Sequence, residues 1–300
     1  MKHELVSILE LYGLQSANTK LIRNYDNSIY KVEAKKNYAL RICSPNTAHQ
    51  RLESEINWLT RLCRDTDLIV PKPIHNKQGN LITRLKNRCC VLFEWLDGEP
   101  VSQNMSTKVA NHVGRMMAKL HLHASSYRLD NYTGDRFDDD YFFGSASWWQ
   151  TKAKKRLQND YESLVPVINK AKYLIESLKK SPKQYGLIHC DLHFGNVICD
   201  RQKYAIIDFA SCGMGYYLMD IAVTEAEFKD YTEAEKLISV FRESYQHQRN
   251  CVLDYKMIET FEAIASLLFL EWVFENDNEK VRCDKAKWIP EIMKRMRAIT

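Results

Sequence analysis

The chain has 300 residues, 45% hydrophobic and 27% charged, a balance typical of a globular protein with a substantial core. Its 43 basic and 38 acidic residues give a net charge of +5, too small and too evenly spread to indicate a nucleic-acid-binding surface. No apolar run reaches the roughly 18 residues of a membrane-spanning helix, and the first residues lack a signal-peptide pattern. We therefore expect a cytoplasmic protein without membrane association.

The first third of the sequence is rich in predicted strands. After an amphipathic helix at residues 5–12, strand-like segments follow at 20–25, 28–34 and 37–43, and this order predicts an antiparallel meander. A helical period over 47–64 ends before Pro71. Two more apolar segments follow, NLITRL and RCCVLFEWL.

Beyond residue 96 the sequence is mainly helical. Helical periodicity covers residues 102–124 and much of the chain after residue 230, and only the segments within 187–209 are strand-like. The sequence contains no internal repeat and no low-complexity linker between these two parts. We expect an α+β fold in which residues 1–95 form one lobe and 96–300 the other, with a hinge at about 94–98.

One polar stretch, IHCDLHFGNV, lies where the hydrophobicity indicates a core. It holds His189, Asp191 and Asn196, and Asp208 follows in IIDF. Phosphoryl transfer from a nucleotide needs a carboxylate to orient or deprotonate the attacking hydroxyl, and oxygen ligands to hold magnesium against the phosphates. These residues supply those groups. The alternative is a polar turn capped by Asp and Asn side chains.

These motifs carry a resemblance to a known superfamily. IHCDLHFGNV, IIDFA and GYYLMDIA resemble the catalytic loop, the metal-binding strand and the following segment of the aminoglycoside phosphotransferase and choline kinase superfamily. NYALRICSP, LESEINWLTRL, VPKPI and VLFEWLDGEP look most like bacterial phosphotransferases related to stress-response and homoserine-kinase-like kinases. The resemblance implies a bilobal protein-kinase-like fold, with a small antiparallel-sheet N-lobe carrying one main helix and a larger, mostly helical C-lobe.

The resemblance also implies roles for single residues. Asp191 matches the catalytic base, and Asn196 and Asp208 match the magnesium ligands. His189 matches a residue that braces the loop, and Asp220 matches a buried aspartate that accepts hydrogen bonds from the loop backbone. His193 stands where protein kinases carry a lysine near the transferred phosphate, so we treat it as part of a possible acceptor site.

In the N-lobe, the resemblance implies a nucleotide site. Arg41 falls at the position of a lysine that contacts the α- and β-phosphates, and Glu55 matches its partner on the helix. Arginine offers a planar fork where lysine offers a point charge, so the two are not equivalent. The alternative is that Arg41 is a solvated strand residue.

The predicted phosphate turn, RNYDNSIYKV, has no glycine, although glycines let backbone amides approach phosphates. Asn27 and Ser28 are the best substitutes, because both residue types accept turn conformations. Backbone groups of Glu94 and Leu96 align with the family hinge that contacts adenine. Phe93 would lie behind the base, or would simply be a core residue.

The acceptor site is expected near the loop at residues 130–150. Its acidic residues could bind a cationic acceptor, its tryptophans could face a cation, or the run could be a solvated turn. The candidates are Asp135, Asp138, Asp139, Asp140, Trp148 and Trp149.

We therefore expect an ATP- and Mg²⁺-dependent phosphotransferase that acts on a hydroxyl of a small molecule, with GTP as a second possible nucleotide. A protein serine or threonine acceptor, as in stress-response kinases, is the first alternative. The second is a pseudokinase that binds nucleotide and regulates a partner, although the presence of Asp191, Asn196 and Asp208 together speaks against it. The nine cysteines, odd in number and without paired spacing, are expected to be reduced thiols.

Overall fold

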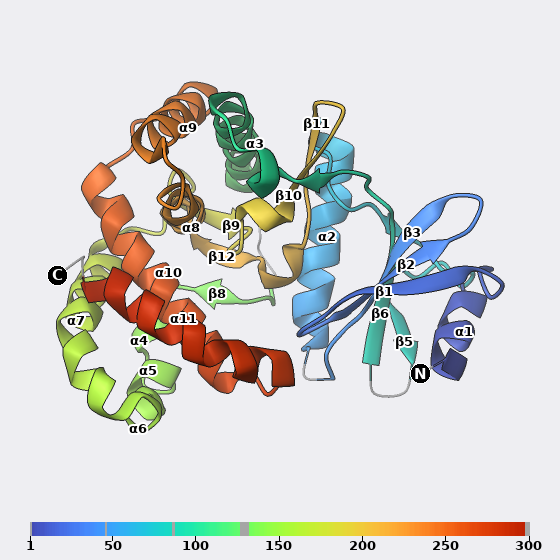
Figure 1. The fold of residues 1–300 in the computed structure, drawn as a ribbon, viewed down its shortest axis with the longest axis horizontal. Coiled ribbons are helices and arrows are strands. Elements are labelled where there is room, and N and C mark those ends of the chain that lie inside the picture. Colours follow the sequence, from blue (N-terminus) through green and yellow to red (C-terminus); the bar gives the residue numbers. More distant parts are fainter. Residues whose placement is uncertain (1, 46, 86–87, 127–131, 298–300) are drawn as a thin grey trace. The chain divides into compact units, whose positions relative to one another are not determined.

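The structure is a computed structural model that describes residues 2–45, 47–85, 88–126 and 132–297. The chain folds into two compact units (Figure 1). The first contains Met1–Pro100, Asp130–Gly134 and Ile198–Ala210, and the second contains Val101–Leu129, Asp135–Val197 and Ser211–Thr300. The chain thus returns to the first unit after residue 100, and the single lobe boundary near residue 96 stays a prediction.

The first unit is built on an antiparallel sheet of order β1-β2-β3-β6-β4, with β5 also paired to β6. Alternation along β2 buries Tyr30 and Val32 on one face, as the period of a strand requires. The strands are β1 (Asn18–Asn24), β2 (Ser28–Glu33), β3 (Asn37–Ile42), β4 (Pro73–Ile74), β5 (Thr83–Leu85) and β6 (Arg88–Glu94).

The α-helices described in this unit are α1 (Lys2–Glu10) and α2 (His49–Asp65). The apolar side of α1 joins one core cluster with Val32 and Leu40 of the sheet. Helix α2 buries residues at helical spacing on one side, as its sequence period predicts. These are Leu52, Glu55, Ile56, Trp58, Leu59 and Leu62.

A later part of the chain completes the first unit. Strand β10 (Val197–Asp200) lies between β11 (Lys203–Ile206) and β7 (Glu99–Pro100). Ile69 pairs with Ala205 of β11 in a parallel bridge. This pairing attaches the segment that contains Asp208 to the N-terminal unit.

The second unit is mostly helical. Helix α3 packs against α9, and α8 packs against α10 (Figure 1). Its longer helices are α3 (Thr107–Ser126), α7 (Tyr161–Ser177), α8 (Tyr217–Phe228), α9 (Ala234–Arg249), α10 (Tyr255–Glu275) and α11 (Glu279–Arg297). Its short helices are α4 (Asp139–Phe143), α5 (Trp148–Thr151) and α6 (Ala153–Leu157).

A small sheet in this unit positions the polar loop. It has the order β8-β12-β9, from β8 (Arg136–Phe137), β12 (Gly213–Tyr216) and β9 (Tyr185–Ile188). All four residues of β9 are buried, and the chain leaves this strand directly into His189 and Asp191. The predicted α+β class, with an antiparallel N-terminal sheet and a mostly helical remainder, is confirmed. Among the described residues, no helix is both long and apolar enough to cross a membrane.

Candidate active site

One face of α8 holds the backbone of the polar loop. Asp220 accepts hydrogen bonds from the amides of His189 at 2.9 Å and Cys190 at 2.7 Å. One turn further along the helix, the hydroxyl of Thr224 donates to the carbonyl of Leu192 at 2.7 Å. Because Asp220 and Thr224 have no exposed surface, these bonds form away from solvent and fix the loop strongly.

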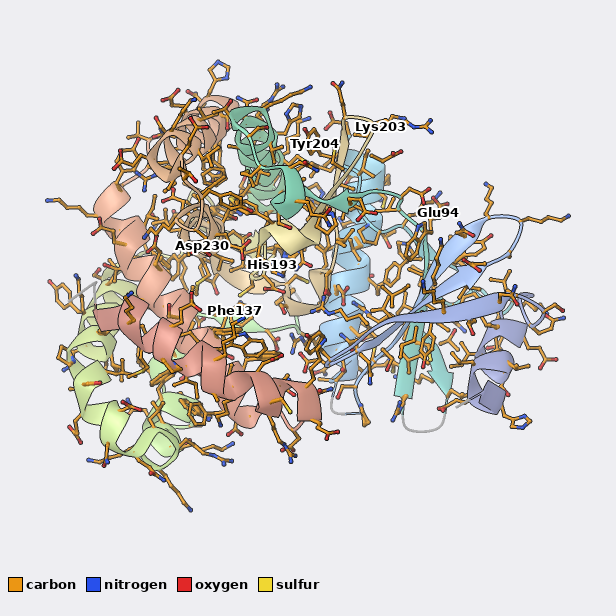
Figure 2. All side chains as sticks on the ribbon, viewed as in Figure 1. Glu94, Phe137, His193, Lys203, Tyr204 and Asp230 are labelled. Atoms are coloured by element: carbon orange, nitrogen blue, oxygen red, sulfur yellow. The ribbon has the colours of Figure 1, made fainter. Side chains whose placement is uncertain are left out.

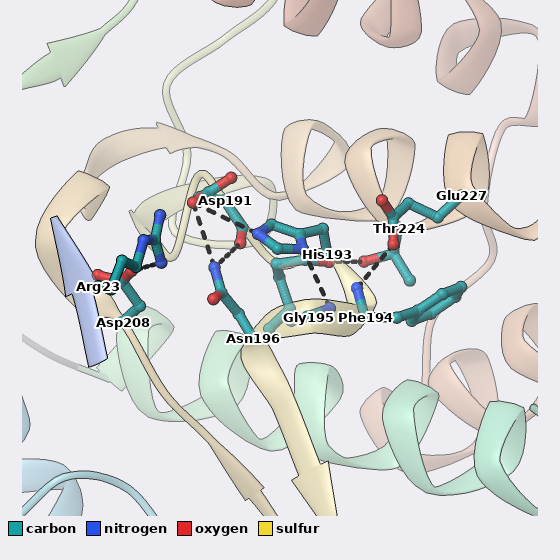
Figure 3. Close-up of polar contacts among 10 residues, drawn as sticks. Arg23, Asp191, His193, Phe194, Gly195, Asn196, Asp208, Thr224 and Glu227 are labelled. Carbon is teal, nitrogen blue, oxygen red and sulfur yellow. Dashed lines mark hydrogen bonds and ion pairs between the residues drawn. The ribbon is translucent and has the colours of Figure 1, made fainter. Parts of the chain in front are cut away.

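Glu227 extends the same helical face toward the end of the loop. Its carboxylate accepts a hydrogen bond from the amide of Phe194 at 2.8 Å (Figure 3). Asp220, Thr224 and Glu227 are thus spaced i, i+4 and i+7, which places them on one side of α8. The loop is therefore anchored at three points along its length.

A second layer supports Asp220 from behind. The ring of His121 on α3 contacts the Asp220 carboxylate through Nε2 at 3.1 Å and the hydroxyl of Tyr245 through Nδ1 at 2.8 Å. Arg249 in turn donates to that hydroxyl at 2.9 Å. Burial lowers the pKa of His121, although the neighbouring carboxylate opposes this effect. A neutral ring that donates through Nε2 to Asp220 and accepts at Nδ1 satisfies all these contacts.

Asp191 lies on the loop that the side chains of α8 anchor. Its side chain is 42% exposed, whereas Asn196 is buried. The Asn196 amide donates to the backbone oxygen of Asp191 at 2.9 Å and to its carboxylate at 3.2 Å (Figure 3). With its nitrogen used in this way, Asn196 retains its side-chain oxygen as an acceptor. Cys190, next to Asp191, has a φ of 65°, a left-handed conformation that is uncommon for a non-glycine residue.

His193 lies beside the aspartate. Its Nδ1 accepts a hydrogen bond from the amide of Gly195 at 3.0 Å, and its Nε2 lies 3.9 Å from the Asp191 carboxylate. The histidine therefore caps the short 3-10 turn Phe194–Asn196. A role for His193 toward an acceptor stays a prediction.

The first unit contains a buried ion pair. Arg41 on β3 makes two hydrogen bonds with Glu55 on α2, at 2.8 Å and 2.7 Å, and both side chains are buried. Burial opposes the charge of Arg41, but the Glu55 carboxylate outweighs it and raises the pKa of Arg41. The alternative of a solvated strand residue is wrong for Arg41. The guanidinium also lies 5.4 Å from the centre of the buried Phe93 ring.

Asp208 follows β11 in the same unit. It has a φ of 64°, and its carboxylate forms an ion pair with Arg23 of β1 at 2.7 Å (Figure 3). The next residue, Phe209, is buried and packs edge-on against Trp58 of α2. Arg51 of α2 donates to the carbonyl of Ala210 at 2.8 Å. Helix α2 therefore fixes the backbone on the C-terminal side of Asp208.

The predicted phosphate turn and hinge residues have partners of their own. Asn27 accepts a hydrogen bond from the amide of Ser44 at 3.2 Å, and Ser28 donates to Asn24 at 2.8 Å. Glu94, labelled in Figure 2, ends β6 and lies 3.3 Å from the ammonium group of Lys72. Leu96 is partly exposed just beyond the strand. Contacts of these residues with a nucleotide stay predictions.

Several residues of the predicted acceptor site at 130–150 have structural contacts of their own. Asp138 caps α4 and, together with Asp139, binds Lys180 at 2.9 Å and 2.7 Å. The hydrogen bond to Lys180 lowers the pKa of Asp139. These contacts account for two of the acidic residues without an acceptor.

Four other candidates belong to the same stretch. Asp140 lies in α4, and the carbonyl of Asp135 accepts a hydrogen bond from Met214 at 2.8 Å. Trp148 and Trp149 are buried, and the Trp148 indole donates to Glu275 at 3.0 Å. Acceptor binding by this stretch stays a prediction.

Each unit contains an oxygen donor that is suitable for a metal arriving with a nucleotide. Among the described residues, no three His, Cys, Asp or Glu side chains cluster in a way that could hold an ion. Mg²⁺ commonly takes one or two protein oxygens together with substrate phosphates. The Asp208 carboxylate in the first unit is a donor of this kind, and so is the side-chain oxygen of Asn196 in the second unit.

Sequence reasoning missed several residues that the structure connects to these groups. They are Arg23, Arg51, His121, Thr224 and Glu227. A signal existed for two of them, because Thr224 and Glu227 continue the helical spacing of Asp220 through the otherwise apolar start of α8. A lone histidine or arginine gives no comparable signal.

Comparison with known proteins identifies the family. Residues 19–242 match the Phosphotransferase enzyme family, and the chain belongs to this family. The amicoumacin kinase of Bacillus subtilis (strain 168) is 23% identical over 223 residues, which cover 71% of this chain and 63% of that protein. The chain therefore spans less than two thirds of this curated relative.

Two solved structures share the fold. A microcompartment-associated aminopropanol kinase superposes with a TM-score of 0.81 at 21% identity, covering 98% of this chain and 94% of that one. An amicoumacin kinase determined with AMP-PNP and Ca²⁺ superposes with a TM-score of 0.77 at 17% identity, covering 94% and 88%. The predicted kinase-like fold is confirmed.

Proposed function

We propose that the protein transfers the γ-phosphoryl group of ATP to a hydroxyl of a small molecule, with Mg²⁺ as the metal. The observation that carries this proposal is the half-exposed Asp191 on a loop whose backbone is fixed by three side chains of α8. A carboxylate held in this way can meet an incoming hydroxyl without reorganising. Family membership and relatives that are named small-molecule kinases support the same activity.

The proposed chemistry begins at Asp191. Its carboxylate accepts the proton of the acceptor hydroxyl as the hydroxyl oxygen bonds to the γ-phosphorus. The bond between the γ-phosphorus and the bridging oxygen breaks, and ADP leaves. Asn196 and Asp208 are the proposed magnesium ligands, and bound Mg²⁺ supplies charge neutralisation on the phosphates.

The remaining residues bind and orient. Arg41 is the proposed contact of the α- and β-phosphates, and Glu55 keeps the guanidinium group of Arg41 in one orientation. Asn27 and Ser28 are proposed at the phosphate turn. The backbone of Glu94 and Leu96 is proposed for the adenine edge, with Phe93 behind it.

The acceptor is proposed to be a small hydroxyl compound. Two of the relatives are named as kinases of amicoumacin and of aminopropanol. We therefore give amino alcohols and hydroxylated antibiotics priority over peptides as candidate acceptors. His193 and the acidic stretch at residues 135–140 are the proposed contacts of the acceptor.

The test is a screen for acceptor-dependent ADP release with ATP and with GTP. Amino alcohols, hydroxylated amino acids, antibiotics and serine- or threonine-containing peptides are compared in wild type and in Asp191→Asn. We expect one class of small molecule to raise ADP release in wild type only, with a phosphate monoester detected in the product. Release confined to peptides would reassign the acceptor, and equal release in both proteins would remove Asp191 from the chemistry.

A further inference from the structure

Arg23 is a cation whose position depends on an irregularity in β1. Regular antiparallel pairing joins Leu21 to Tyr30, but the next pair is Arg23 with Ile29, so Ile22 is an extra residue in β1. Such a bulge shifts the alternation of a strand and turns the following side chains to the other face. Bulges of this kind often redirect a side chain near a functional site.

The register identifies the face to which Arg23 turns. Ile29 pairs on its other side with Arg41 of β3, and residues paired directly across antiparallel strands share a face. Without the bulge, Arg23 would pair with Ser28, which is the partner of Ile42 in the core cluster. The extra residue therefore places Arg23 on the face that carries Arg41.

Arg23 contacts a carboxylate from a later part of the chain. Its guanidinium forms an ion pair with Asp208 at 2.7 Å. The Arg23 side chain remains 43% exposed and Asp208 26% exposed, so water or a ligand can reach the pair. Exposed ion pairs contribute little to stability, so stability alone gives little reason for this arrangement.

We propose that Arg23 is a phosphate-binding residue of the nucleotide site, replacing the charge and amide contacts that a glycine-rich turn would provide. The inference rests on the proposed function. In the structure, Arg23 pairs with Asp208. A metal held by Asp208 would compensate this carboxylate and would leave the guanidinium of Arg23 available to the β- or γ-phosphate. Arg23 orients and binds, and it takes part in no bond-making step.

The test measures nucleotide binding by calorimetry, independently of turnover. Wild type, Arg23→Gln and Arg23→Lys are titrated with Mg²⁺ and ATP, and separately with AMP and adenosine. Lys20→Gln is the matched control, because Lys20 lies on the same exposed strand and pairs with Lys31, two residues from Ile29. Thermal unfolding of each variant confirms that the fold is intact.

We expect Arg23→Gln to weaken Mg²⁺–ATP binding about tenfold, as for loss of one charge-assisted hydrogen bond. Arg23→Lys should lose about threefold, and Lys20→Gln should match wild type. Adenosine and AMP should bind all four proteins equally.

Three results would overturn the inference: ATP affinity of Arg23→Gln within twofold of wild type, an equal loss for adenosine, or a gain in affinity. A gain would mean that Arg23 only competes with the metal. If the wild-type protein binds no ATP at all, the proposed function itself is rejected. Failure of the Arg23 inference and failure of the proposed function therefore give different results.

Discussion

Arg41 and Glu55 form a buried pair with two parallel hydrogen bonds, at 2.8 Å and 2.7 Å, between a strand and the main helix of the same unit. Both side chains are almost completely buried, so each charge depends mainly on the other for compensation. The stability of the folded chain is therefore expected to be sensitive to the loss of either partner.

Replacing Glu55 by Ala should lower the free energy of unfolding by about 3–5 kcal/mol, because it leaves the Arg41 charge buried without a partner. Urea denaturation measures this change. The matched control is Glu53→Ala, on the same helix, where the side chain is 48% exposed. That substitution should cost less than about 0.5 kcal/mol. Equal stability of the two variants would contradict the role given to the pair.

Asp191→Asn should lower turnover by about 10²–10⁴, the contribution of a positioned general base. Asparagine keeps the size of the side chain and its contact with Asn196, so the affinity for ATP should stay within about twofold of wild type. Steady-state rates and calorimetric binding are compared on the same preparation. Unchanged turnover would exclude Asp191 as the base.

Asp208→Asn should weaken Mg²⁺-dependent ATP binding by about tenfold or more, because an amide is a poorer ligand for Mg²⁺ than a carboxylate. Asparagine is preferred to alanine because it tolerates the left-handed backbone at φ 64°. Titrations with Mg²⁺ and with EDTA separate the metal-dependent part. An identical affinity in both proteins with Mg²⁺ present would contradict the role of Asp208.

His121 should make stability depend on pH. Burial lowers the pKa of His121 in the folded protein, so the unfolded chain binds this proton first, near its usual pKa of about 6.5. The free energy of unfolding should therefore fall as the pH drops below about 6.5. His121→Asn should be less stable at pH 8 by about 1–3 kcal/mol, and its stability should change less between pH 7 and 5. Parallel pH profiles would contradict this assignment.

Glu271, near the end of α10, should have the opposite pH dependence. Burial, with a smaller contribution from Glu275, raises the pKa of Glu271 to about 7. The unfolded chain ionises near pH 4.5, so stability should fall as the pH rises from about 4.5 to 7. Glu271→Gln should gain about 1–2 kcal/mol at pH 8 and nothing at pH 5. Thermal unfolding at both values tests this.

Much of this arrangement can be predicted from sequence because it is local or periodic. The strands at 20–43, the helix that carries Glu55 and the spacing from His189 to Asn196 follow from alternation, helical period and short motifs. Burial of Arg41 could not be predicted in the same way, since a polar residue in a strand usually faces water. Only its partner fourteen residues later accounts for its position.

Other contacts depend on facts that a sequence pattern does not contain. The partnership of His121 with Asp220 joins residues 99 positions apart and requires the packing of α3. The face of Arg23 depends on one extra residue in β1, and simple alternation predicts the opposite face. Strand register is set by pairing across the sheet, which a single strand does not specify.

Cys190 and Asp208 both have left-handed backbones, each at or next to a residue assigned to the chemistry. Such conformations cost of order 1–3 kcal/mol, and glycine at either position would relieve the cost. Selection for heat resistance alone would therefore favour glycine at residue 190, but glycine there would also make the backbone next to the proposed base more flexible. Thermal stability and the proposed catalytic rate would therefore depend on the same backbone conformations, at Cys190 and Asp208.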